Sequence, residues 1–136
     1  MVRTDPAGLR ELTLDECMAL LAGAPLGRIV YTDRALPAVQ PVLFHLDGGA
    51  VVIRTSAGSA LAAAVQDTVV AFEVDEVDAR TRTGWSVTAV GHARVVDDPA
   101  ETARLDLLPL RRWAPAGHER FILLRLERLT GRRIAP

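Results

Sequence analysis

Six short segments rich in β-branched and apolar residues constrain this chain more than any other feature of its sequence. They lie at residues 27–32, 37–46, 50–55, 68–75, 85–96 and 120–129. Asp47-Gly48-Gly49 is typical of a hairpin turn, and Pro41 is typical of an edge strand or a bulge, because proline has no backbone N–H to donate. Such links favour antiparallel pairing, and a closed barrel removes the exposed edges of the sheet. The sequence therefore predicts a six-stranded antiparallel β-barrel.

Short helices are expected around this barrel. Thr13-Leu14-Asp15-Glu16 is a capping box, in which the Thr13 side chain accepts from the Glu16 amide and the Glu16 carboxylate reaches back. This signal predicts a helix over about 14–22. Two further helices are expected over about 58–65 and 99–107, and a polar loop is expected over 76–84.

Length and composition limit the class of protein. A chain of 136 residues, 49% of them hydrophobic, is typical of one folded domain. We expect a single mainly β (α+β) domain over 1–136, with the barrel over about 27–134. A net charge of −1 and a pI of about 6.3 give no electrostatic reason to bind nucleic acid. All 16 basic residues are arginine, which excludes Schiff-base chemistry on a lysine.

The sequence shows no targeting or disulfide signal. The first residues, MVRTDP, contain no apolar signal segment, and no run approaches the roughly 18 residues of a membrane span. The single cysteine, Cys17, excludes an internal disulfide. Its helical spacing with Leu14, Met18 and Leu21 predicts packing on a helix face. We therefore expect a cytoplasmic protein that contacts no membrane.

The most informative local motif is R-T-S-A-G-S at residues 54–59, which joins a strand to an alanine-rich helix. Exposed amides at the start of a helix suit an anion such as a phosphate. Arg54 would supply the main charge, and Thr55, Gly58 and Ser59 would supply neutral hydroxyl and backbone donors. Glycine and serine also link strands to helices in any fold, so a purely structural turn is the alternative.

Histidines and carboxylates give weaker signals. His45, His92 and His118 lack the spacing of metal ligands, so no metal site is expected. His45 suits either a proton donor beside a ligand or a solvent-facing side chain. The carboxylates between residues 73 and 78 suit either acid–base chemistry or a solvated strand face.

Six segments, taken in succession, resemble one protein family. They are GRIVYTD (27–33), PAVQPV (37–42), RTSAGS (54–59), FEVD (72–75), GWSVTAVGHA (84–93) and LTGRRI (129–134). In this order, over about residues 9–134, the chain resembles the pyridoxamine 5′-phosphate oxidase-like group, the flavin-binding split barrels, in a small actinobacterial-type branch. The resemblance implies a split β-barrel and a homodimer that holds FMN, or a deazaflavin, in a groove between its subunits.

The resemblance also implies which residues lie near the flavin. Those along the flavin or near its ring are Gln40, Pro41, Val42, His45, Trp85 and Ser86, and those at its phosphate are Arg54, Thr55, Gly58 and Ser59. Trp113 or Arg120 would reach the flavin of the partner subunit.

Two positions depart from the family pattern. Relatives usually carry a lysine or arginine directly after the Gly-Ser, where this chain has Ala60, and Gln40 stands where the oxidases proper have an arginine. Each missing cation removes a charge-assisted hydrogen bond of about 1.5–3 kcal/mol. FMN is therefore expected to bind with reduced affinity.

The resemblance implies a flavin-dependent oxidoreductase whose substrate and catalytic residues are unknown, because the cofactor supplies the chemistry. The alternative is a non-catalytic split-barrel protein that binds or senses a ligand. In that case the flavin phosphate site would be weakened or lost, as the residues at positions 40 and 60 suggest.

Overall fold

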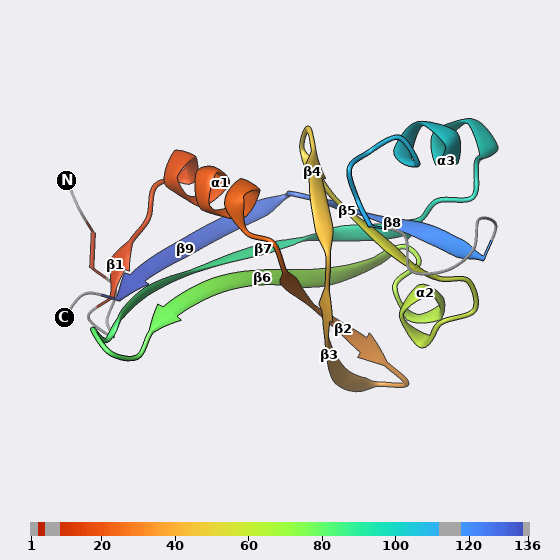
Figure 1. Ribbon diagram of the computed structural model, residues 1–136. Coiled ribbons are helices and arrows are strands. Elements are labelled where there is room, and N and C mark those ends of the chain that lie inside the picture. The colour runs from red at the N-terminus through yellow and green to blue at the C-terminus, as the bar shows by residue number, and fades with distance from the viewer. Residues whose placement is uncertain (1–2, 5–8, 112–117, 135–136) are drawn as a thin grey trace.

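The computed structural model describes the chain except for residues 1–2, 5–8, 112–117 and 135–136 (Figure 1). Its strands are β1 (Arg10–Glu11), β2 (Gly27–Asp33), β3 (Leu36–Val42), β4 (Phe44–Asp47), β5 (Ala50–Ser56), β6 (Thr68–Asp78), β7 (Thr83–Val95), β8 (Glu119–Arg125) and β9 (Arg128–Ile134). Its helices are α1 (Leu14–Gly23), α2 (Ala60–Ala64) and α3 (Pro99–Leu105).

One antiparallel sheet contains all nine described strands, in the order β3-β2-β6-β7-β8-β5-β4, while β9 pairs with both β7 and β1. The long β6–β7 hairpin runs the length of the molecule, and the remaining strands gather around it (Figure 1). β3 and β4 lie at opposite ends of this order, although only Leu43 separates them along the chain. The antiparallel split barrel is confirmed, and backbone pairing between the described strands does not close it.

The sheet has more strands than the six expected, because two predicted strands are each divided and β1 carried no signal. The predicted strand over 37–46 becomes β3 and β4 because the chain leaves β2 and joins β5 at Leu43. The predicted strand over 120–129 ends as β8 at Arg125, and β9 begins at Arg128 and continues to Ile134, beyond the predicted segment, where it pairs with β7 and β1. Apolar periodicity continues through a change of partner and therefore does not reveal it.

Proline and glycine occupy positions that the pairing explains. Among the described strands, β3 pairs only with β2, so the absent N–H of Pro41 is tolerated on this edge strand, as expected. β7 pairs with β9 up to Val90 and with β8 from Ala93. Gly91 lies at this change of partner, where an added Cβ would clash with the backbone carbonyl of Arg125. The polar loop expected over 76–84 is shorter, because β6 and β7 extend into it.

The capping box predicted for the first helix is confirmed. The Glu16 amide donates to Thr13 Oγ1 at 3.2 Å, and the Thr13 amide donates to Glu16 Oε1 at 2.9 Å. Cys17 packs in the core, where burial raises the pKa of its thiol. α2 is shorter than the helix expected over 58–65, because Gly58 has a φ of +80° and Ser59 is the N-cap. No helix in the described part of the chain is long and apolar enough to cross a membrane.

Two hydrophobic clusters lie on opposite faces of β5. Val51 and Ile53 pack inside the barrel, whereas Val52 joins the smaller cluster with Leu105 and Phe121 beneath α3. Side chains alternate between the two faces of a strand. Two consecutive residues at the end of β5 must therefore face different surroundings, and this determines the geometry of the site.

Candidate functional site

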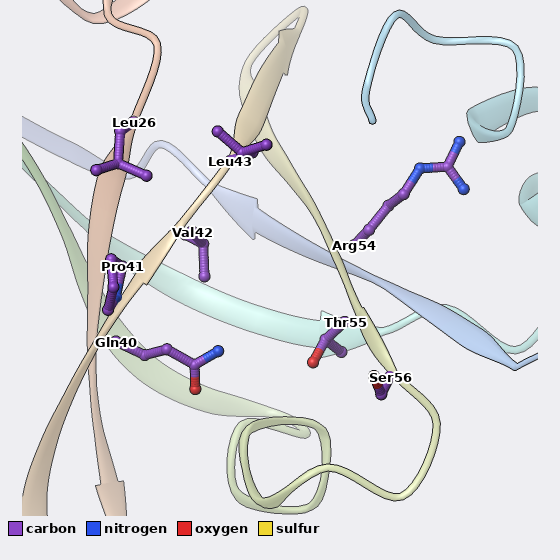
Figure 2. Close-up of a pocket in the computed structure, with 8 residues that line it drawn as sticks. All are labelled: Leu26, Gln40, Pro41, Val42, Leu43, Arg54, Thr55 and Ser56. Carbon is purple, nitrogen blue, oxygen red and sulfur yellow. The ribbon is translucent and has the colours of Figure 1, made fainter. Parts of the chain in front are cut away.

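A cavity of about 410 Å³ lies where the chain crosses from β3 to β4, beside the end of β5 (Figure 2). It is lined by Leu26, Gln40, Pro41, Val42, Leu43, Arg54, Thr55 and Ser56. The cavity follows from the topology, because β3 is held by β2 and diverges from β5 before β4 begins. Its volume falls in the range of about 300–1,000 Å³ that is typical of small-molecule sites.

The wall formed by β3 has an unpaired edge. β3 pairs with β2 along one side only, so every second residue directs its backbone polar groups toward the β5 side. Pro41 contributes a carbonyl and no N–H at this edge. Figure 2 shows the Gln40 side chain and the Thr55 hydroxyl extending into the space between the two strands. This wall offers neutral hydrogen-bonding groups to a ligand.

The turn after β5 is held by its own side chains. The Thr55 and Ser59 hydroxyl oxygens lie 2.9 Å apart, and Ser59 Oγ accepts the Ala62 amide at 3.0 Å. The Ser59 amide donates to the Ser56 carbonyl at 3.1 Å. Because one hydroxyl donates to the other, one hydroxyl hydrogen of the Thr55–Ser59 pair is left for a ligand. The turn is thus compact and supplies neutral donors.

Arg54 has partners on the opposite face of β5 from Thr55. Its Nε donates to the Leu110 carbonyl at 2.9 Å, and its guanidinium lies 2.9 Å from Asp106 Oδ1 and 3.6 Å from Glu119 Oε1. The guanidinium carbon also lies 4.6 Å from the centroid of the Phe121 ring. The side chain is only 5% exposed, and Figure 2 shows it extending away from Thr55.

The positive charge of Arg54, which was expected at the turn, is directed to the other face of β5. Arg54 is the only cationic residue among those that line the cavity, and its guanidinium is engaged by carboxylates. The position after Ser59 is Ala60, which carries no charge. Within the described protomer, the groups that face the space between β3 and β5 are therefore neutral.

The structure brings together some of the residues expected at the site and separates others. Gln40, Pro41, Val42, Arg54 and Thr55 line one cavity, and the Thr55–Ser59 contact places Ser59 and Gly58 directly beside it. Trp85 lines a different cavity of about 310 Å³ with Glu76, Asp78 and Arg133.

That second cavity lies at the far end of the β6–β7 hairpin from α2 (Figure 1). Ser86 follows Trp85 on β7, opposite Asp75, and is equally remote from the turn after β5. His45 pairs with Val52 on β4 and does not line the first cavity. Arg120 is exposed on β8, and Trp113 lies outside the described residues.

Three lining residues were not among the site residues expected from the sequence: Leu26, Leu43 and Ser56. Leu26 precedes β2 and reaches the cavity because Gly27 pairs with Val42. Leu43 is the residue at which the chain changes partner, and no local pattern marks it. Ser56 was within reach of sequence reasoning, because it directly follows Thr55 in the turn motif.

Glu73 and Asp75 of β6 lie on the outer face of the sheet. Arg28 Nη1 lies 3.3 Å from Glu73 Oε1 and 3.0 Å from Asp75 Oδ2. Burial, and then the neighbouring Asp75 carboxylate, raise the pKa of Glu73 to about 7. Val70, Phe72 and Val74, which alternate with these residues, point into the core. The described residues contain no cluster of three or more His, Cys, Asp or Glu side chains that could hold a metal ion.

Residues 13–133 match the model of the family described as pyridoxamine 5′-phosphate oxidase. The chain belongs to this family. It is also 39% identical over 140 residues to an uncharacterized protein of Mycobacterium tuberculosis, with 97% of this chain and 91% of that protein covered.

Solved structures of similar proteins support the fold. A protein from Mycobacterium smegmatis, described as FAD-binding, has a TM-score of 0.77 and 32% identity, covering 93% of this chain and 98% of that one. A conserved protein of unknown function from Corynebacterium diphtheriae has a TM-score of 0.80 and 29% identity, covering 96% of this chain and 100% of that one.

Proposed function

We propose that this member of the pyridoxamine 5′-phosphate oxidase family binds a flavin in the cavity between β3 and β5 and acts as a flavin-dependent oxidoreductase. The observation that carries the proposal is the cavity itself, which joins the unpaired edge of β3 to the Thr55–Ser59 turn. The similar M. smegmatis protein, described as FAD-binding, supports a flavin as the ligand. When bound, the isoalloxazine ring supplies the hydride and electron chemistry.

The chain's own residues would bind and orient the flavin. The Pro41 carbonyl at the unpaired edge of β3 and the Gln40 side chain would bond to the polar edge of the ring. Leu26 and Leu43 would cover its apolar surface and exclude water. The Thr55–Ser59 pair would donate one hydroxyl hydrogen to the phosphate.

The hydrogen-bonding groups of the cavity fit the ring of a flavin, but they do not offset the charge of the FMN phosphate. That phosphate is a dianion, and the groups that face the cavity are neutral because Arg54 is engaged by Asp106 and Glu119. A charge-assisted bond is roughly twice as strong as a neutral one. We therefore propose that FMN and a deazaflavin mononucleotide bind with reduced affinity.

We also propose a homodimer. Trp85 and Ser86 lie near the start of β7, and Figure 1 shows this end of the β6–β7 hairpin far from α2. Only a second copy would bring them to a flavin bound at the turn after β5. The outer face of the sheet exposes apolar side chains, with Val39 62%, Val69 58% and Val77 60% exposed. Burying this face in a dimer interface of more than about 1,000 Å² would cover them.

The test is a titration of the apoprotein with FMN, FAD and a deazaflavin, followed by visible absorption and calorimetry. Stoichiometric uptake of at least one flavin, followed by reduction with a nicotinamide and reoxidation, is the expected result. Uptake without any reduction or reoxidation would favour the non-catalytic binding protein, which the neutral turn also suits. Absence of uptake for all three compounds would overturn the flavin assignment.

A further inference from the structure

A second groove lies beside the same turn, between α2 and the β2–β3 hairpin. It has a volume of about 500 Å³ and separates the tip of the β2–β3 hairpin from α2 (Figure 1). It is lined by Thr32, Asp33, Arg34, Ala35, Ala60, Ala63, Ala64 and Thr68. Ala60 directly follows Ser59, so the groove begins one residue beyond the turn at which the flavin phosphate is proposed to bind.

The helix wall of this groove carries only methyl groups. Ala60, Ala63 and Ala64 share one face of α2, because residues three and four apart lie on the same side of a helix. The opposite face packs Leu61 into the core, so the helix is fixed in place. A lysine or arginine at position 60 would extend across this wall, whereas the alanine leaves it clear.

The hairpin wall carries a cation that has no partner among the described residues. Arg34 is exposed, and no hydrogen bond or ion pair joins it to any other described residue. Arg54 differs, since its guanidinium contacts two carboxylates. Of Arg34 and Arg54, Arg34 is therefore the one whose charge is available to an anion.

A carboxylate next to this cation narrows the ligand class. Asp33 lines the same groove and is half-buried. A carboxylate repels a free phosphate but accepts hydrogen bonds from the vicinal hydroxyls of a ribose. One cation, one carboxylate and an apolar wall together suit a nucleoside phosphate, in which phosphate, sugar and base need different partners.

We propose that this groove holds the adenosine half of FAD, with Arg34 at the distal phosphate and Asp33 at the ribose, so that the protein selects FAD over FMN. The inference rests on the proposed flavin site between β3 and β5. It extends that site past Ala60 and over the small face of α2. Each phosphate of FAD carries a single negative charge, which suits the neutral turn better than the dianion of FMN does.

The main experiment fills the groove and compares two flavins by calorimetry. Wild-type apoprotein is expected to bind FAD at least about tenfold more tightly than FMN, a difference of about 1.4 kcal/mol. Ala63→Leu should remove this preference by weakening FAD alone, because the added isobutyl group occupies the groove. Ala62→Leu is the matched control, since Ala62 lies on the same helix but does not line the groove, and it should leave both affinities unchanged.

The charge is tested separately with Arg34→Asn. Asparagine tolerates the positive φ of this residue, so the hairpin is retained while the cation is lost. FAD affinity should fall several-fold, with less salt dependence, and FMN affinity should stay within about twofold. If FAD and FMN bind with equal affinity and Ala63→Leu changes neither, the groove does not bind adenosine. The proposed flavin site between β3 and β5 would not be affected by this result. Failure to bind either flavin would overturn both.

Discussion

Arg54 and Thr55 are consecutive residues, yet they belong to two regions of opposite electrostatic character. On the Arg54 face of β5, a buried guanidinium contacts Asp106, Glu119, the Leu110 carbonyl and the Phe121 ring. On the Thr55 face, the space beside β3 is lined by hydroxyl, amide and apolar groups. The cation thus connects α3 to the sheet, and the groups that face the cavity beside β3 are neutral.

The comparison shows that the position of a residue along a strand, as well as its type, determines which surroundings its side chain meets. Strand alternation places position 54 with Val52 and position 55 with Val51 and Ile53. A side chain at position 54 lies on the same face of β5 as Val52, so it points toward α3 whatever its charge. Direct contact between Arg54 and a phosphate stays a prediction, and the following experiments are arranged to break or sharpen the contrast between the two faces.

The largest effect is expected on the charged face. Arg54→Met removes the cation that lies between two carboxylates, and removing one partner of a buried ion pair typically costs about 3–5 kcal/mol. The free energy of unfolding, measured in urea, should fall by about this amount. Arg120→Met is the control, because Arg120 is exposed on the neighbouring strand and its loss should cost less than about 0.5 kcal/mol.

The same variant tests the contrast itself. If Arg54 is architectural, flavin affinity should fall no more than the loss of folded protein explains. An Arg54→Met protein of normal stability that no longer binds flavin would contradict the description and make Arg54 a phosphate ligand.

The second effect adds a charge to the neutral face. Ala60→Lys places a cation directly after Ser59, where a charge-assisted bond of about 1.5–3 kcal/mol becomes available to a phosphate. Affinity for FMN should rise about tenfold to a hundredfold in calorimetry, and the gain should shrink in high salt. The same side chain obstructs the groove beside α2, so the preference for FAD should narrow or reverse.

Ala62→Lys is the control for this experiment, because it adds the same charge to the same helix away from the groove. If Ala60→Lys leaves the affinity for FMN unchanged, the phosphate does not bind at this turn.

How much of this could be predicted from sequence differs between the fold and the site. The antiparallel barrel, the capping box at Thr13 and the edge position of Pro41 follow from local patterns, and the structure contains all three. The division at Leu43 does not, because a strand that changes partners keeps its apolar pattern.

The site depends still more on distant residues. The opposite directions of Arg54 and Thr55 could have been read from the alternation of β5. The partners of Arg54 could not, because Asp106 and Leu110 are more than fifty positions away in sequence. The separation of Trp85 from the turn likewise appears only in the three-dimensional arrangement (Figure 1).

The third effect concerns the hairpin that carries the available cation. Arg34 and Ala35 form its two-residue turn with φ values of 52° and 65°, a conformation that favours Asn-Gly. The double replacement Arg34→Asn with Ala35→Gly should raise the free energy of unfolding by about 1 kcal/mol. It should also lower the affinity for FAD, so stability and binding would change in opposite directions.

Ala35→Gly alone separates the two contributions. It relieves strain and keeps the cation, so it should stabilise the protein without loss of FAD affinity. A loss of affinity equal to that of the double variant would show that the hairpin conformation, not the Arg34 charge, determines binding.

The smallest effect is expected on the outer face of the sheet. It tests whether a charged side chain on this face affects the stability of the fold, as Arg54 is expected to do on its own face. Glu73 lies beside Asp75 and Arg28 on this face, and its pKa is raised from 4.5 to about 7. The folded state therefore binds more protons than the unfolded state between these values, so this group's contribution to stability is lost as the pH rises through that window. Because Glu73 is partly exposed, the loss should stay below about 1 kcal/mol.

Glu73→Gln removes the titration while keeping the shape of the side chain. In urea unfolding at pH 5, 6, 7 and 8, stability should fall less steeply with pH in the variant than in the wild type. The variant should become the more stable protein above about pH 7. Glu76→Gln, an exposed neighbour on β6, is the matched control and should follow the wild-type profile. If the two variants behave alike, Glu73 is an ordinary solvated carboxylate.

If a flavin or a second subunit covers this face, the difference between Glu73→Gln and wild type should grow with ligand or protein concentration, because further burial raises the cost of the charged form.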